Sequence, residues 1–171
     1  VVLAGAQLLQ ADTILLTNAA RLLVEAKDNG GQAGGQWAAT GSVVQADKPI
    51  VVFGGSAGAE VPAGTKYADH IEHVMFPVSS WGKTYAVARA PRYHERDYVR
   101  FLAYKDGTEI RLTPGPTSGG TEVVTIAGRQ WLEMPTRSAY MVEASAAIMV
   151  GQSLQIPLRQ RYAEVLATWD E

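Results

Sequence analysis

Alternating polar and apolar positions dominate the second half of the chain. Residues 98–104 are rich in aromatic and β-branched side chains, and residues 108–113 alternate polar with apolar, so both stretches predict β-strands. Between them, Lys105-Asp106-Gly107 predicts a tight hairpin, because Asp-Gly accepts the positive φ angles of a type I′ turn. Further strands are predicted over residues 122–126, 130–134, 140–143 and 147–151, with a loop over 114–120. Short strands at this spacing are typical of an antiparallel sheet.

The first half is less regular. Ile50–Phe53 predicts a hydrophobic strand that follows Lys48-Pro49 and runs into a glycine-rich turn. Residues 12–27 have helical spacing, with apolar side chains on one face and Asn29-Gly30 as a stop signal, so a short amphipathic helix is expected there. The internal similarity described next favours a strand for the same segment, and both alternatives stay open.

The chain resembles itself. Residues 46–52 are similar to residues 144–150, residues 19–25 echo 127–133, and these echoes come in the same order in both halves. This order predicts a duplication: a first β unit over residues 1–90 with long loop insertions, and a second over 91–171. The expected fold is all-β, with two related antiparallel units in a β-sandwich arrangement. Propeller-like blades are the alternative.

Composition narrows the functional class. The 171 residues are 47% hydrophobic and 19% charged, which is a globular composition. A net charge of −2 favours neither nucleic acid nor an anionic membrane as partner. The absence of cysteine excludes disulfides and thiolate chemistry. No apolar run reaches the roughly 20 residues of a membrane helix, so no membrane span is expected within this chain.

Three motifs stand in order along the chain: Asp47-Lys48-Pro49 before an apolar strand, Asp69-His70 followed by Pro77-Val78-Ser79-Ser80-Trp81-Gly82, and Asp106-Gly107-Thr108. Together they resemble the N-terminal domain family of the IgG Fc-binding protein, over about residues 4–162. The resemblance implies tandem β units and an extracellular binding or scaffold module without catalytic activity. It also implies that Gly58 and Ala68 stand where many members carry a cysteine pair. The Fc-binding activity itself is not carried over to this chain, which has a bacterial character.

Two patterns suggest catalysis or metal binding. Gly54-Gly55-Ser56-Ala57-Gly58 matches G-x-S-x-G after a strand, but Pro62 and Gly64 disfavour the helix that a nucleophile elbow needs. His70 and His73 would share one face of a helix and hold zinc with a carboxylate, yet no distant ligand is evident. A small hydrolase or zinc protein is therefore the least favoured alternative, and no cofactor is expected.

The remaining candidates are binding residues. Asp69 is expected to anchor its loop by accepting backbone N–H bonds, with His70 beside it. Trp81 is either a binding-surface aromatic or, twice as often for such residues, a core plug whose indole N–H meets a carbonyl. Arg92, Tyr93 and Arg96 belong to a basic cluster, with Arg100, that would contact an acidic glycan or a partner's carboxylates, or would form a solvated loop.

The sequence as a whole predicts a non-catalytic binding or adhesion module, extracellular or at the cell surface. Its partner would be a protein or a glycan. A structural subunit of an extracellular filament or layer, self-associating through β edges, is the alternative.

Overall fold

The computed structural model describes residues 2–4, 12–13, 15, 17, 20–23, 40–62, 69–89, 97–136 and 138–154. Nearly all regular structure in these segments is β-strand, and the one helical element is a 3₁₀ turn, η1 (Val78–Ser80). The all-β prediction is confirmed. Within the described segments, no helix has the length and apolar character needed to cross a bilayer.

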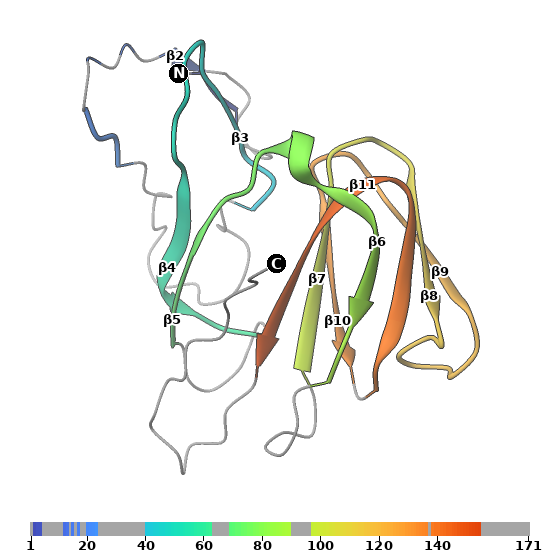
Figure 1. The fold of residues 1–171 in the computed structure, drawn as a ribbon. Helices are drawn as coiled ribbons and strands as arrows, with labels where there is room; N and C mark the ends of the chain where they lie inside the picture. The colour runs from blue at the N-terminus through green and yellow to red at the C-terminus, as the bar shows by residue number, and fades with distance from the viewer. Residues whose placement is uncertain are drawn as a thin grey trace.

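The strands form three sheets (Figure 1). The smallest two are a three-stranded sheet of β1 (Val2–Ala4), β2 (Asp12–Thr13) and β3 (Val43–Gln45), and a two-stranded ribbon of β4 (Phe53–Ala59) and β5 (Asp69–Val74). The large sheet contains β6 (Gly82–Val87), β7 (Asp97–Ala103), β8 (Thr108–Thr113), β9 (Glu122–Ile126), β10 (Trp131–Thr136) and β11 (Tyr140–Leu154).

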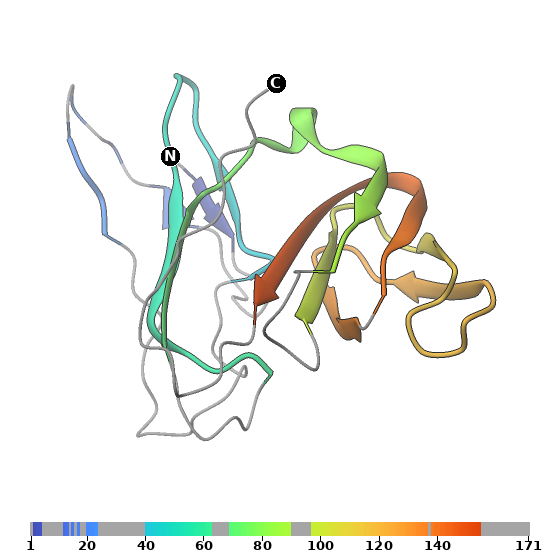
Figure 2. The ribbon, with the colours of Figure 1, turned by 60° about the horizontal axis from the view of Figure 1, so that its bottom comes forward.

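Long, bent strands build the large sheet. Residues Met141–Ala144 of β11 pair with β8, and residues Ile148–Leu154 of the same strand pair with β7. Both pairings are antiparallel, so β7 and β8 run in the same direction along β11. On their other side, β8 pairs with β9 and β7 pairs with β10. The segments β7–β8 and β9–β10 therefore each cross the sheet with a bend between their two strands, and β11 bends in the middle of one strand. β11 visibly arches over the fold (Figures 1 and 2).

The predicted hairpin at Lys105-Asp106-Gly107 is wrong. Gly107 does adopt a positive φ of 62°, as the Asp-Gly pattern predicts. The chain nevertheless continues forward from β7 into β8, because both strands pair with β11 rather than with each other. A left-handed residue serves a bend or bulge as well as a hairpin turn. The reversal comes later, where the loop over residues 114–121 joins β8 to β9.

The core lies inside the curl of the large sheet. Buried side chains alternate with exposed ones along β8, and β7 contributes Val99, Phe101 and Ala103 to the same interior. The remaining buried members come from β6, β8, β9 and β11: Val87, Ile110, Leu112, Ile126, Tyr140, Val142 and Ile148. Burial of these side chains is the main force that stabilises the curl. None of the residues of the ribbon β4–β5 belongs to this core.

Two expectations for the first half need comment. The helix expected over 12–27 is wrong for its described residues: Asp12–Thr13 form β2, and 15, 17 and 20–23 are neither helix nor strand. Leu15 and Leu22, which that helix would bury on its apolar face, are 92% and 39% exposed. The domain boundary at residue 90 stays a prediction, although β6 precedes it and pairs with β11 in the large sheet.

Candidate binding site on the β4–β5 ribbon

β4 and β5 form an isolated antiparallel ribbon beside the large sheet (Figures 1 and 2). The register places Phe53 opposite Val74 and Ser56 opposite Ile71. Glycine permits this close pairing, because a Cβ on Gly55 would lie 2.8 Å from the backbone oxygen of Ile71. Among the described strands, neither β4 nor β5 pairs with any third strand.

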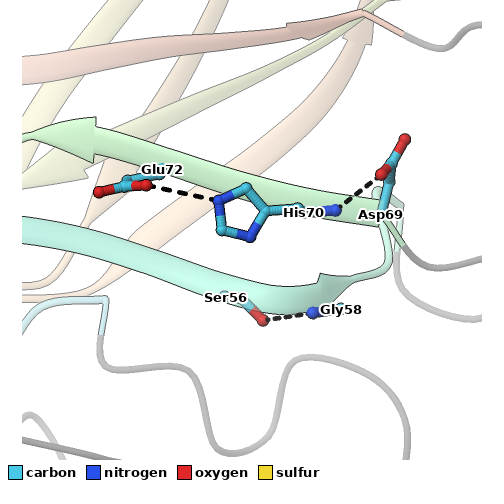
Figure 3. Close-up of polar contacts among 5 residues, drawn as sticks. All are labelled: Ser56, Gly58, Asp69, His70 and Glu72. Atoms are coloured by element: carbon cyan, nitrogen blue, oxygen red, sulfur yellow. Dashed lines mark hydrogen bonds and ion pairs between the residues drawn. The ribbon is translucent and has the colours of Figure 1, made fainter. Parts of the chain in front are cut away.

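The G-x-S-x-G segment lies within β4. Ser56 occupies an extended strand, and its Oγ accepts a hydrogen bond from the backbone N–H of Gly58 at 3.3 Å (Figure 3). A nucleophile elbow is instead a sharp strand-to-helix turn that exposes the serine to a histidine. The imidazole of His70 contacts Glu72, not Ser56. The geometry of a hydrolase elbow is therefore not present at Ser56.

Asp69 and His70 lie together at the start of β5. The backbone N–H of His70 donates to Asp69 Oδ1 at 2.8 Å, so Asp69 does accept a backbone hydrogen bond (Figure 3). His70 Nε2 lies 3.5 Å from Glu72 Oε2, and both side chains are well exposed. An exposed pair of this kind contributes little to stability.

The two histidines of β5 are separated by the strand. Residues three apart in a strand point to opposite faces, whereas the zinc hypothesis required a helix. His73 Nδ1 lies 2.6 Å from the carbonyl oxygen of Val74, to which it donates when protonated at that nitrogen. Across the described segments, no cluster of three histidine, aspartate or glutamate side chains is arranged to hold a metal ion.

Trp81 follows the ribbon at the corner that leads into β6. Its indole Nε1–H donates to the carbonyl oxygen of Phe76 at 3.2 Å, and the side chain is half-buried. The preceding turn is closed by Ser80, whose Oγ and backbone N–H both donate to the Pro77 carbonyl oxygen at 2.8 and 2.9 Å. These contacts give the Pro77–Gly82 motif a structural part in turning the chain.

Four large apolar side chains, here called the ribbon stripe, lie in the open on the ribbon. Phe53 and Val74 are cross-strand partners at one end of the ribbon. Val51 lies two residues before Phe53 and Phe76 two residues after Val74, just beyond the ends of the two strands. Their exposed fractions are 72% for Val51, 63% for Phe53, 42% for Val74 and 57% for Phe76. The sequence does not predict this surface, because an apolar run before a glycine-rich turn is equally typical of a core strand.

The structure describes only part of the basic cluster. Arg92, Tyr93 and Arg96 lie outside the described residues. Arg100, grouped with them by sequence, lies instead on β7: its Nη2 is 2.9 Å from Glu133 Oε2, and its guanidinium lies 4.1 Å from the centroid of the Trp131 ring. Asp69 and His70 thus lie together at the start of β5, whereas Trp81 lies beyond the other end of that strand, after η1.

A sequence model of the family described as IgGFc binding protein matches residues 13–158. The chain belongs to this family. The matched region covers the ribbon and the whole large sheet. No curated protein and no solved structure matches the chain. Membership of the IgGFc binding protein family makes the chain a binding module in general terms.

Proposed function

We propose that the chain is a non-catalytic binding and adhesion module, extracellular or at a cell surface, and that it docks a partner protein on the ribbon stripe. Membership of the IgGFc binding protein family supports a binding role and protein as the partner class. The further steps to adhesion and to an outside location rest on the resemblance and on the character of the ribbon.

The ribbon stripe is the observation that carries the proposal. Contiguous exposed apolar side chains on a soluble protein mark interaction surfaces, and aromatic anchors such as Phe53 and Phe76 supply much of the binding energy at protein interfaces. The exposed pair His70–Glu72 lies further along β5 and would form a polar rim. Of the two partner classes expected from sequence, a protein fits this apolar surface better than a glycan.

Binding to immobilised proteins tests the proposal. The family description makes the Fc fragment of IgG the first probe, followed by a panel of purified extracellular matrix and surface proteins. We expect the double variant Phe53→Ser/Phe76→Ser to lose at least about tenfold in affinity for any protein that the chain binds, because both apolar anchors are removed. The core of the large sheet is untouched, so the thermal unfolding midpoint should hold.

The matched control is Val123→Ser, which removes an equally exposed apolar side chain (52%) from β9. It should bind like the wild type. Equal losses in the double variant and the control, or an unchanged affinity of the double variant, would place the docking surface elsewhere.

A second candidate, a subunit of an extracellular assembly, is favoured by one further observation. β4 and β5 pair only with each other among the described strands, which leaves an edge on each side of the ribbon. Such edges pair readily with strands of other chains. Sedimentation at increasing concentration should then show large species, and Ile71→Lys, which adds a charge to the ribbon, should return the chain to monomers. A wild-type chain that stays monomeric throughout contradicts this candidate.

A further inference from the structure

A hollow of about 650 Å³ lies where β3 meets the two bends of the large sheet, residues 104–107 and 127–130. Its polar lining comes from three separate parts of the chain: Gln45, Tyr104, Asp106, Arg129 and Gln130. The volume falls within the range of small-molecule sites. No residue of the ribbon stripe takes part, so the hollow is a second surface, independent of the proposed docking face.

The backbone at Arg129 is unusual. Residues 127–130 form a turn in which the Gln130 N–H donates to the Ala127 carbonyl oxygen at 3.1 Å. Arg129 stands at the third position with φ of 63°, and it is the one non-glycine residue with positive φ in the described segments. Glycine or asparagine is favoured at such a position, because a side chain there is strained. Strained non-glycine residues occur preferentially at functional sites.

The side chain of Arg129 is available to a ligand. It is exposed, and no carboxylate within the described residues forms an ion pair with it. A guanidinium binds a carboxylate through two parallel hydrogen bonds, which gives both strength and orientation. In the same hollow, Asp106 Oδ1 already accepts the Gly128 N–H at 3.2 Å and has further lone pairs for hydroxyl donors.

The other lining residues suit a hydroxyl-rich molecule. Gln45 and Gln130 are exposed amides, and each offers both donors and an acceptor. Tyr104, another lining residue, is 42% exposed, so its aromatic ring is accessible to a ligand. Rings and a few well-placed polar groups are the usual composition of small-ligand sites. Arg129 and Asp106 together carry no net charge, which disfavours a multiply charged anion such as a phosphate ester.

We propose that this hollow binds a sugar residue that carries one carboxylate, at the end or within a glycan. Arg129 holds the carboxylate, the two glutamines and Asp106 take the hydroxyl groups, and Tyr104 packs against the sugar ring. The inference adds a glycan site to the module and does not depend on the protein-docking role of the ribbon.

A matched pair of probes tests the site: methyl glucuronide and methyl glucoside, which differ only at C6, a carboxylate in the first and a hydroxymethyl group in the second, with acetate as a third ligand. Titration followed by backbone amide NMR should move the signals of Gln45 and of Gly128–Gln130 with glucuronide at millimolar concentration. Binding of glucoside should be weaker by about tenfold or more, because the ion pair is lost. Acetate should leave the Gln45 signal in place.

Two variants complete the test. Arg129→Gly removes the guanidinium and also the backbone strain, so it should abolish glucuronide binding while raising the thermal unfolding midpoint. Arg129→Gln keeps a side chain on the strained backbone and should bind glucuronide as weakly as Arg129→Gly does. The comparison separates the loss of the charge from any change in the fold. Arg111→Gln, at an exposed arginine of β8 outside the hollow, should bind like the wild type.

Four results would overturn the proposal. Equal binding of glucoside and glucuronide would show that Arg129 does not hold the carboxylate. Equal shifts with acetate would show that the sugar ring makes no contribution to binding. An unchanged affinity of Arg129→Gly for glucuronide, or the absence of any shift with glucuronide, would show that the hollow is not a binding site for this sugar.

Discussion

Asp106 and Gly128, 22 positions apart, join the two bends of the large sheet: Asp106 Oδ1 accepts the backbone N–H of Gly128 at 3.2 Å. The backbone N–H of Arg129 adds a bond to the Ala103 carbonyl oxygen at 2.7 Å. The bend between β7 and β8 therefore lies directly against the bend between β9 and β10. The chain therefore bends between β7 and β8 at the same place in the sheet as it bends between β9 and β10. These two adjacent bends curl the sheet around its core.

Close contact between the bends makes Gly128 sensitive to any side chain. A Cβ there would lie 3.0 Å from the Asp106 nitrogen and 3.1 Å from the Tyr104 carbonyl oxygen, both backbone atoms that cannot turn aside. We expect Gly128→Ala to lower the free energy of unfolding by about 1–3 kcal/mol in urea titrations. Gly151→Ala is the control, because a Cβ at Gly151 meets nothing within 4 Å, and it should be neutral or stabilising. Equal effects would show that the bends have room to separate.

Arg100 and Glu133 form a cross-strand pair that solvent screens only in part, with side chains 28% and 13% exposed. Arg100→Ala leaves the carboxylate of Glu133 without its partner and uncovers Trp131, so we expect a loss of about 1–3 kcal/mol in the free energy of unfolding. Arg100→Lys should recover only part, because an ammonium lacks the flat face that stacks on the ring. A double-mutant cycle with Glu133→Ala measures the coupling. A coupling energy near zero would contradict this view of the pair.

Tyr140 should make stability fall at high pH. Burial raises the pKa of its phenol from 10.0 to about 12, and the side chain is only 3% exposed. The folded state therefore favours the neutral form: this contribution is full below pH 10 and is lost as the pH rises towards 12. We expect Tyr140→Phe to remove most of the fall, on the order of 1–3 kcal/mol. At pH 7 the same variant should be neutral or stabilising, since the hydroxyl has no hydrogen-bond partner in the described structure. A wild-type unfolding curve that does not change between pH 9 and 11 would contradict the prediction.

Glu122 organises the loop over residues 114–121 and should do so down to low pH. The Thr117 hydroxyl and backbone N–H donate to Glu122 Oε1 at 2.6 and 2.9 Å, and these hydrogen bonds lower the pKa of the carboxyl to about 2 despite the opposing effect of desolvation. Since the folded pKa is depressed, the contribution is present above pH 4.5 and is lost as the pH falls through about 2. NMR titration of the Thr117 and Ser118 amides should follow this low midpoint. Glu122→Gln should remove the titration and speed proteolysis of the loop, whereas a midpoint near 4.5 in the wild type would show that the carboxylate is not held.

Local patterns predicted the elements of the large sheet with good accuracy. Tyr98–Tyr104 and Thr108–Thr113 were expected as strands, and β7 and β8 occupy almost the same residues. The all-β class followed from the same alternation. The two stretches at 140–143 and 147–151 were expected as separate strands, but they are the two arms of β11. The break between them is a register shift against β6, and a local pattern does not distinguish such a bulge from a loop.

In the candidate site too, local features follow from the sequence, and features that depend on packing do not. Asp69 and His70 are adjacent in sequence, so they lie side by side whatever the fold. The ribbon stripe was not foreseen, because the apolar residues of 50–53 indicate burial in general and do not show whether another layer covers them. Arg100 was assigned to a loop cluster, and only its pairing with Glu133 across two strands takes it away from that cluster.

By itself, the amino-acid sequence determined the strand-forming segments, the left-handed position at Gly107 and the family, because each depends on residues close together or on their order along the chain. The tertiary structure alone decided that Asp106-Gly107 bends the chain without reversing it, since the answer depends on β11, some 40 residues away. It also decided which apolar side chains enter the curl and which stay on the ribbon. Burial is a property of what packs against a residue, and that partner comes from a distant part of the chain.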